Sequence, residues 1–418
     1  MSCHGRTRDW AAVVRGCRVR LGRPHRWWWL AICGGLLTIT APAEPPPVNV
    51  RPAVVKIGLL LPPSEADAGD ILRGAQLGVV MVNRQSGRKV QLIVRGKPGQ
   101  WGTDGDEAVA LALDEDVVAL VAPTGGAVVH QALQVAGRTR VPVVSLSADT
   151  SVTRTGIPWT IRVGPRTDEE AAAVFAALRR PAGSPPLRVV AFVPTDRAGR
   201  EVTNDLQSAA RAVQVAWVDS FAVPAGIAPT AGLVSRALAA KPDLILAWLD
   251  AAAVVGVAKS LRNAGYTGAI AAPSRSWSPA VLRTQAPSAE GILFPLPLAV
   301  TETNVWWERF RREFSEGAPG PTAASGPPAA QPEPPDLVAG LAFDAVRLLA
   351  DVLNRADGRP AFREFPLTRS LPGVTGELVF DHAGNQRLPL RVVAFRTDGG
   401  FQILRPEVGG TVGQRPHD

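Results

Sequence analysis

A small glycine-rich turn is the feature of this sequence that comes closest to a chemical site. Residues 120–127 read LVAPTGGA, so that an apolar run ends at Thr124, Gly125 and Gly126, where a helix is predicted to begin. The first turn of a helix presents free backbone N–H groups, which suit a carboxylate or another small polar group. A phosphate loop is not indicated, because neither Gly-Lys-Ser/Thr nor Gly-x-Gly-x-x-Gly accompanies the turn. A tight turn that needs glycine only for its backbone is the alternative.

Residue types that support catalysis or metal binding are scarce in this sequence. All 3 cysteines lie within residues 1–33, and the histidines beyond residue 43 are far apart. A zinc site needs three or four ligands in one cluster, and an enzyme needs an activated nucleophile, a metal or a pair of well-placed carboxylates. We therefore expect no cofactor, no metal and no enzymatic activity.

The first 43 residues have the composition of an export signal. Arg-rich residues 1–26 precede the apolar run WWWLAICGGLLTITAPA, in which Ala41-Pro42-Ala43 matches a small-x-small cleavage site. The sequence thus predicts a signal peptide over residues 1–43 and a Pro-rich spacer over residues 44–53. The alternative is an uncleaved membrane anchor, for which an apolar run of 17 residues is short.

The formal net charge of +8 comes mostly from this leader. Residues 1–43 contain seven arginines and one aspartate, a net of +6 that leaves +2 for the rest of the chain. A body this close to neutrality lacks the basic surface that nucleic-acid binding requires. We therefore expect no nucleic-acid partner.

The elements that must position the glycine-rich turn alternate along the chain between short apolar runs and segments with helical spacing. Short continuous apolar runs are typical of strands buried on both faces of a parallel sheet. The predicted strands are 54–61, 90–94, 117–121, 141–146, 159–163, 188–193, 215–221, 244–249 and 269–272. The predicted helices among them are 70–83, 106–113, 127–137, 168–179, 199–213, 231–240 and 251–264. Two such series predict an α/β fold of two lobes with parallel sheets.

The last third of the chain breaks this alternation. A Pro-rich segment at 317–335 predicts a flexible loop between helices at 302–316 and 337–356. Residues 374–380 and 390–395 alternate in polarity like the two strands of a hairpin, with DHAGNQ as the turn between them.

Eight segments match one family in order along the chain, among them WTIRVGPRTDEE (159–170) and FDAVRLLADVL (343–353). The other six are VKIGLLLPPS (55–64), GDILRGAQLGVVMVN (69–83), VVALVAPTGG (117–126), VPVVSLSADT (141–150), KPDLILAWLDAAAVVGVAKSLRNAGYTG (241–268) and GVTGELVFDHAGNQ (373–386). Together they resemble the type I periplasmic solute-binding proteins of the leucine/isoleucine/valine-binding group, which serve branched-chain amino acid ABC transporters. No single segment is specific to this family, but the ordered set of segments is.

The resemblance implies two Rossmann-like lobes joined by a hinge of three crossing strands, with a solute enclosed between them. Lobe 1 would comprise residues 54–164 and 296–387, and lobe 2 residues 165–295 and 388–405, with a disordered tail at 406–418. The implied function is an exported, periplasmic or otherwise extracytoplasmic monomer that delivers a small polar solute, an amino acid or amide, to an ABC permease. The alternative is a ligand-sensing module for a membrane receptor or sensor kinase, without transport.

The resemblance places the lobe 1 part of the site on two loops. In amino-acid-binding members these loops hold the α-carboxylate of the solute with hydroxyl and N–H groups. The corresponding positions here are Thr124, Gly125, Ser147, Ala148 and Asp149, with Pro63 and Ser64 flanking the same cleft. Asp149 replaces a threonine, and its carboxylate would repel a solute carboxylate and favour a cationic or hydroxyl-rich group. The alternative is that Asp149 only caps the turn at residues 151–152.

The lobe 2 part of the site departs from the pattern of the family. Ala198 stands where a tyrosine usually covers the solute, and Asp250 best matches the acidic group that pairs with a solute ammonium. The alternative for Asp250 is the N-cap of the helix at 251–264. Arg275 is a candidate partner for an acidic solute, or simply a solvated loop residue.

Three tryptophans fall near loops or strand ends that face the expected cleft: Trp101, Trp248 and Trp277. One of them stacking on the solute would offset the missing tyrosine. The alternative for each is packing within a lobe, which is what large aromatic side chains mostly do.

Overall fold

The structure is a computed structural model that describes residues 54–85, 89–99, 102–316, 335–355 and 370–404. All of these lie in one of the two compact units of the chain, Pro52–Asp418. The predicted signal peptide, spacer, Pro-rich loop and tail, together with Trp101, lie outside the described residues.

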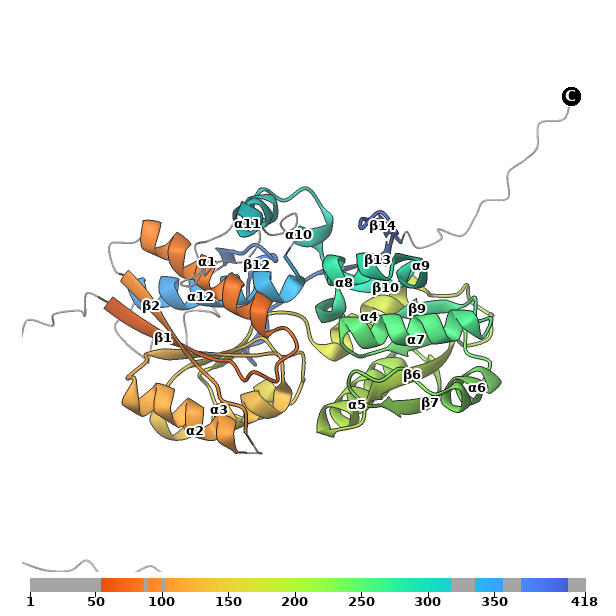
Figure 1. Cartoon of the computed structure of the whole chain (residues 1–418), viewed down its shortest axis with the longest axis horizontal. Coiled ribbons are helices and arrows are strands. Elements are labelled where there is room, and N and C mark those ends of the chain that lie inside the picture. The colour runs from red at the N-terminus through yellow and green to blue at the C-terminus, as the bar shows by residue number, and fades with distance from the viewer. Residues whose placement is uncertain (1–53, 86–88, 100–101, 317–334, 356–369, 405–418) are drawn as a thin grey trace, which may run out of the picture. The chain divides into compact units, whose positions relative to one another are not determined.

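The first sheet is built mostly from buried, short apolar runs, whereas its edge strand at residues 89–95 is largely half-buried or exposed. Its five strands are all parallel, in the order β2-β1-β3-β4-β5. Their bounds are β1 Val54–Leu60, β2 Lys89–Arg95, β3 Ala119–Ala122, β4 Val143–Ser145 and β5 Thr160–Arg162. One face is covered by α1 (Ala68–Gln85) and α12 (Leu337–Arg355), the other by α2 (Thr103–Val109), a π-helical turn (Ala110–Asp114) and α3 (Gly126–Thr139) (Figure 1).

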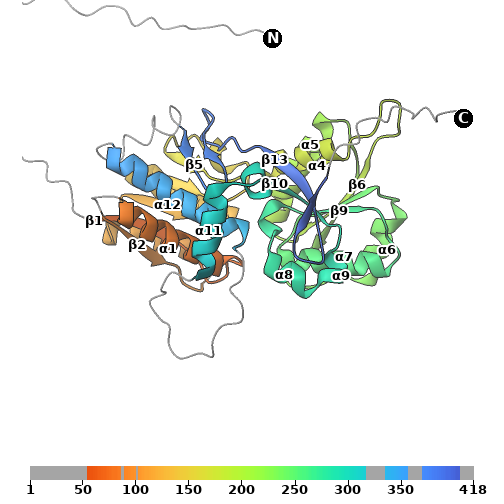
Figure 2. The same cartoon turned by 90° about the horizontal axis from the view of Figure 1, so that it is seen from above.

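Helices α1 and α12 lie side by side because small residues allow a close approach (Figure 2). The buried stripe of α1 includes Gly74 and Gly78. A Cβ atom on Gly74 would lie 2.0 Å from the carbonyl oxygen of Ala339 in α12. Glycine is therefore needed at this crossing for steric reasons.

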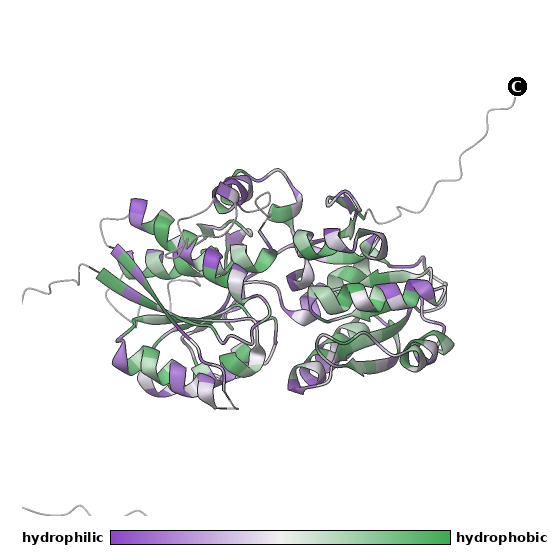
Figure 3. Cartoon of the chain, in the orientation of Figure 1, coloured by the Kyte–Doolittle hydropathy of each residue, from purple (hydrophilic) through white to green (hydrophobic). Residues whose placement is uncertain are grey.

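The second sheet has seven strands in the order β14-β13-β10-β9-β8-β6-β7. Their bounds are β6 Arg188–Pro194, β7 Ala216–Val223, β8 Leu244–Ala247, β9 Ala269–Ala271, β10 Leu293–Pro297, β13 Leu390–Phe395 and β14 Phe401–Ile403. Helices α4 (Thr167–Ala177) and α5 (Arg197–Ala212) pack on one face, and α6 (Ala231–Ala239) and α7 (Ala251–Asn263) on the other. The strands of both sheets are mostly hydrophobic, whereas hydrophilic residues lie on the outer sides of the helices (Figure 3).

Short elements complete the described residues. They are two 3₁₀ turns (Val152–Arg154 and Ser274–Ser276), α8 (Pro279–Thr284), α9 (Ala286–Ala289), α10 (Leu298–Thr301), α11 (Val305–Glu316), β11 (Leu371–Pro372) and β12 (Glu377–Leu378). None of the described helices is both long and apolar enough to cross a membrane. The two-lobed α/β fold with parallel sheets is confirmed.

The predicted hairpin of residues 374–380 and 390–395 is wrong. Strand β13 pairs antiparallel with β10 and with β14, while β12 pairs with β11. The strand β10 escaped prediction because it contains Pro295 and Pro297, which interrupt sheet hydrogen bonding. It tolerates them because its pairing with β9 is confined to Leu293 and Ala271. Alternating polarity in residues 390–395 fits a strand but does not specify its partner.

The chain passes between the two sheets three times: between β5 and α4, after β10, and before β13. Two of these crossings are tied together by hydrogen bonds. The Arg162 N–H donates to the Gly384 carbonyl at 2.8 Å, and the Gly164 N–H donates to Gln386 Oε1 at 2.8 Å. The first and third crossings are therefore connected to each other.

Candidate functional site

A small cavity has walls from both lobes. Lobe 1 contributes residues 124–127 and 147–149, which follow β3 and β4. Lobe 2 contributes residues of α5, Trp248 after β8, and the loop of Pro273 and Arg275 after β9. The cavity volume is about 100 Å³. Because loops at the carboxyl ends of parallel strands meet at one edge of a sheet, this is where the fold places a ligand.

The glycine-rich turn is occupied by a side chain of the protein itself. The Thr124 hydroxyl donates a hydrogen bond to Glu65 Oε1, and the Gly125 N–H donates to Glu65 Oε2 at 3.3 Å. Glu65 lies between β1 and α1, where its own N–H donates to the Pro62 carbonyl at 3.0 Å. No motif in the sequence singles out Glu65. Its position after a parallel strand is the signal by which it could have been found.

Asp149 both lines the cavity and caps its own turn. Its Oδ1 accepts from the Ser151 N–H at 2.8 Å and from the Ser151 hydroxyl at 2.7 Å. A Cβ atom on Gly126 would lie 2.4 Å from Asp149 Oδ2, so glycine leaves room for this carboxylate at the start of α3. The two interpretations of Asp149 thus describe the same geometry.

His130 lies beside Asp149 but does not form a catalytic triad with it. Its Nε2 is 2.8 Å from Ser151 Oγ and 3.7 Å from Asp149 Oδ2. A triad requires the carboxylate on the other ring nitrogen, where it would orient the base toward the serine. Burial lowers the pKa of His130, which favours the neutral ring. Among the described residues, no three His, Cys, Asp or Glu side chains are grouped so that they could hold a metal.

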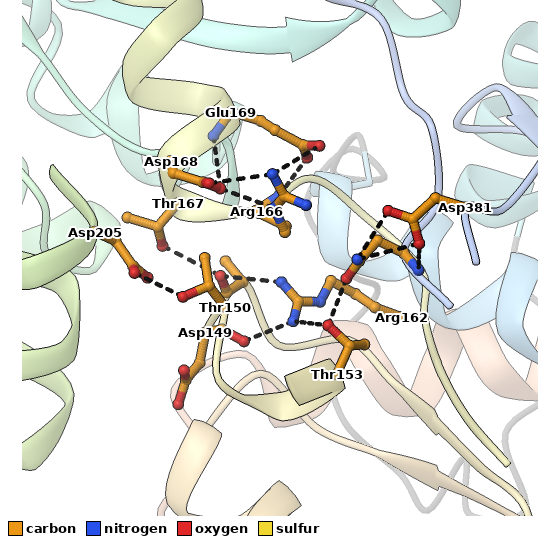
Figure 4. Close-up of polar contacts among 12 residues, drawn as sticks. Asp149, Thr150, Thr153, Arg162, Arg166, Thr167, Asp168, Glu169, Asp205 and Asp381 are labelled. Carbon is orange, nitrogen blue, oxygen red and sulfur yellow. Dashed lines mark hydrogen bonds and ion pairs between the residues drawn. The ribbon is translucent and has the colours of Figure 1, made fainter. Parts of the chain in front are cut away.

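A buried arginine holds the second loop in place (Figure 4). Arg162 is fully buried, and its Nη2 donates to the Asp149 carbonyl at 2.7 Å and to Thr153 Oγ1 at 3.3 Å. Its Nη1 donates to the Ala148 carbonyl at 3.4 Å. Burial lowers the pKa of Arg162 to about 10. Since Arg162 belongs to β5 at a crossing, one side chain links the hinge to the cavity.

One buried hydrogen bond joins the two lobes at the cavity (Figure 4). The Thr150 hydroxyl of lobe 1 donates to Asp205 Oδ1 of α5 at 2.6 Å, and both residues are buried. Arg154 Nη2 in turn donates to Thr150 Oγ1 at 2.7 Å. Burial raises the pKa of Asp205. A charged or polar group at this depth is stable only when it is paired, so the bond favours close contact between the lobes.

The structure places some predicted residues at the cavity and others elsewhere. Those that line it are Thr124, Gly125, Ser147, Ala148, Asp149, Ala198, Trp248 and Arg275. Asp250 does not line it; its carboxylate instead caps α7, accepting from the Ala253 N–H at 2.9 Å. Pro63 and Ser64 are exposed on the loop after β1 and do not line it.

Trp277 is a packing residue, as the alternative interpretation held. It is 5% exposed and lies edge-on to Phe294, Phe395 and Phe401, at 5.2 to 6.0 Å between ring centroids. Its place among strands β10, β13 and β14 follows from a pairing that the sequence did not predict. Trp248 is 1% exposed and contributes to the wall of the cavity.

Burial raises the pKa values of two acidic groups near the cavity. Burial raises the pKa of Asp67 to about 6, Glu65 and Asp250 act in the same direction, and Arg275 opposes them. Burial raises the pKa of Glu170 to about 7. Glu170 Oε1 accepts from the Ser274 N–H at 2.8 Å, whereas its Oε2 has no hydrogen-bond partner. The loop that carries Arg275 is therefore held by a buried carboxyl group.

Two larger hollows, of about 600 and 760 Å³, lie on lobe 2 alone. They are formed around the ends of α6 and α7 and are more open than the cavity between the lobes. A polar solute is best bound where two surfaces supply hydrogen bonds and exclude water. The cavity between the lobes is therefore the better candidate site.

Comparison with known proteins agrees with this geometry. Residues 54–399 match the model of a periplasmic binding protein family. Crystal structures of similar fold include a leucine binding protein, LivK, from Thermotoga maritima, at 20% identity and a TM-score of 0.69, covering 84% of this chain and 97% of that one. No curated protein matches the chain.

Two further crystal structures of similar fold contain ligands. LivJ from Streptococcus pneumoniae, in complex with isoleucine, is 16% identical with a TM-score of 0.68, covering 84% of this chain and 98% of that one. A solute binding protein from R. palustris, in complex with benzoate, is 17% identical with a TM-score of 0.70, covering 86% of this chain and 98% of that one. At these identities the likeness is one of fold.

Proposed function

The chain belongs to the periplasmic binding protein family, and on this premise we propose that it is the solute-binding component of an ABC transporter. Proteins of this family are extracytoplasmic and bind solutes. The finer proposal is that this chain is exported by its signal peptide and captures a small polar solute, an amino acid or an amide. It then delivers the solute to the permease subunits as a monomer. We propose binding and no catalysis.

The cavity with walls from both lobes is the observation that carries this proposal. It combines a buried indole, Trp248, with hydroxyl, carboxylate and guanidinium groups on opposite sides. A polar solute enclosed there exchanges hydrogen bonds with water for hydrogen bonds with both lobes. Binding therefore stabilises the arrangement in which the lobes are in contact.

The size of the cavity indicates how the solute enters. A volume of about 100 Å³ holds only a few water molecules, since each occupies about 30 Å³. Pockets that enclose organic ligands are usually about 300 Å³ or larger. We therefore propose that the lobes separate about the three crossings to admit the solute.

The proposal is tested by thermal denaturation with a panel of amino acids, amides, polyamines and aromatic acids. A solute at 100 times its Kd stabilises the folded protein by about 2.7 kcal/mol, a shift of several degrees. We expect at least one class to raise the midpoint. Absence of a shift across the panel would contradict solute binding.

A pair of substitutions in α5 tests whether the solute binds in the cavity between the lobes. Ala198 lines the cavity, whereas Ala212 is exposed at the other end of the same helix. We expect Ala198→Trp to fill the cavity and abolish the shift, and Ala212→Trp to retain it. If both variants keep the full shift, the solute binds elsewhere.

A further inference from the structure

We propose that Glu65 makes the cavity select solutes that present N–H or cationic groups, and discriminate against carboxylates. This inference rests on the proposed function and names the class of solute. It is carried by the contact between the Glu65 carboxylate and the start of α3.

Two of the donors at the start of α3 are already used. Thr124 has one hydroxyl hydrogen, and Gly125 has one backbone N–H. Both are directed at Glu65, and Thr124 is only 9% exposed. A solute carboxylate placed at Thr124 and Gly125 would have to displace Glu65 or share its donors. Glu65 does not itself line the cavity and acts on it through Thr124 and Gly125, which do.

Backbone hydrogen bonds hold Glu65 in position. The loop after β1 turns at Pro62, whose carbonyl accepts from the Glu65 N–H, and the Glu65 carbonyl accepts from the Ala68 N–H at 3.2 Å as α1 begins. A Cβ atom on Gly125 would lie 3.1 Å from Glu65 Oε2. The glycine therefore leaves the space that the carboxylate occupies.

The other charged groups at the cavity favour the same class of solute. Asp149, Glu201 and Asp205 line it, against the cations Arg197 and Arg275. Arg197 is 3.8 Å from Glu201, and Arg275 acts on the buried carboxyl group of Asp67. Three acidic groups thus line the cavity against two basic ones, and both cations have acidic neighbours. Glu65 adds a further negative charge next to Thr124 and Gly125. An ammonium, amidinium or amide N–H can donate hydrogen bonds to these acidic groups, whereas a carboxylate is repelled by their like charge.

Calorimetric titration with matched pairs of solutes tests the inference. Each pair shares a side chain and an amino group and differs only in its carboxylate: glycine and glycinamide, leucine and leucinamide, phenylalanine and phenylalaninamide. We expect the wild-type protein to bind the amide of at least one pair tenfold or more tightly than the acid. Glu65→Gln keeps the length of the side chain and removes its charge, and should reduce this ratio at least tenfold. Glu65→Ala frees both donors and should favour the acid.

Glu308→Gln is the control, because Glu308 is exposed on α11 and does not line the cavity. It should leave the ratio unchanged. Wild-type protein that binds acids as tightly as amides, or a ratio that persists in Glu65→Gln, would overturn the inference and leave solute binding intact. Failure of every pair to bind the wild type and both Glu65 variants would overturn the proposed function, and the inference with it.

Discussion

Individual side chains around the cavity are held by contacts with residues far away in the sequence. Glu65 accepts hydrogen bonds from Thr124 and Gly125, and Arg162 donates hydrogen bonds to the carbonyl groups of residues 148 and 149. The glycine-rich turn pointed to Thr124 and Gly125 as candidate site residues, and the family resemblance added Asp149. They could not predict Glu65, because its role depends on a turn 59 residues later in the chain.

Glu170 should make the stability of the protein depend on pH. Its pKa is about 7 in the folded chain, against 4.5 for an ordinary glutamate, because the carboxyl group is fully buried. Folding therefore favours the protonated form. The resulting stability is fully present below pH 4.5 and is lost as the pH rises through about 7, a change on the order of 3 kcal/mol.

Glu170→Gln tests this directly, since it fixes the neutral form with nearly the same shape. Measured by urea denaturation between pH 5 and 8, the free energy of unfolding of the wild type should fall more steeply than that of the variant. The surface variant Glu308→Gln should follow the wild type. Equal slopes for all three proteins would show that Glu170 titrates normally.

At the scale of elements, short apolar runs predicted the parallel strands because such strands are buried on both faces. The strands β3 and β8 are buried at every position. The pattern failed where it was interrupted by proline, at β10, and where alternation left the partner of β13 open. Strand partners depend on tertiary contacts, which a local pattern does not contain.

The crossing of α1 and α12 provides a prediction at this scale. Gly74→Ala would bring a Cβ atom within 2.0 Å of the Ala339 carbonyl oxygen, so the two helices would have to move apart. We expect a loss of at least about 2 kcal/mol in the free energy of unfolding, measured by urea denaturation.

Gly69→Ala is the matched control on the same helix, since a Cβ atom there meets no atom within 4 Å. Alanine is also the better helix former, so this variant should be as stable as the wild type or gain up to about 1 kcal/mol. Equal stability of the two variants would contradict close packing at Gly74.

At the scale of the whole molecule, alternation of strands and helices was sufficient to predict two α/β lobes, and the family resemblance placed the site between them. Composition could not predict how two of the three crossings are bound to each other through Arg162, Gly164 and Gln386. It also could not predict that Thr150 and Asp205 meet across the lobes. Such contacts arise only when segments distant in the sequence are brought together.

Hydrogen–deuterium exchange tests most directly that one solute is held by both lobes. The protein is first freed of bound solute by unfolding, dialysis and refolding, and exchange is then compared with and without the mixed solute panel. We predict slower exchange in the lobe 1 segments 124–127 and 147–149 and, in the same sample, at residues 197–205 of α5, all of which contribute to the cavity. Protection confined to one lobe, or unchanged exchange in all three segments, would contradict a solute bound between them.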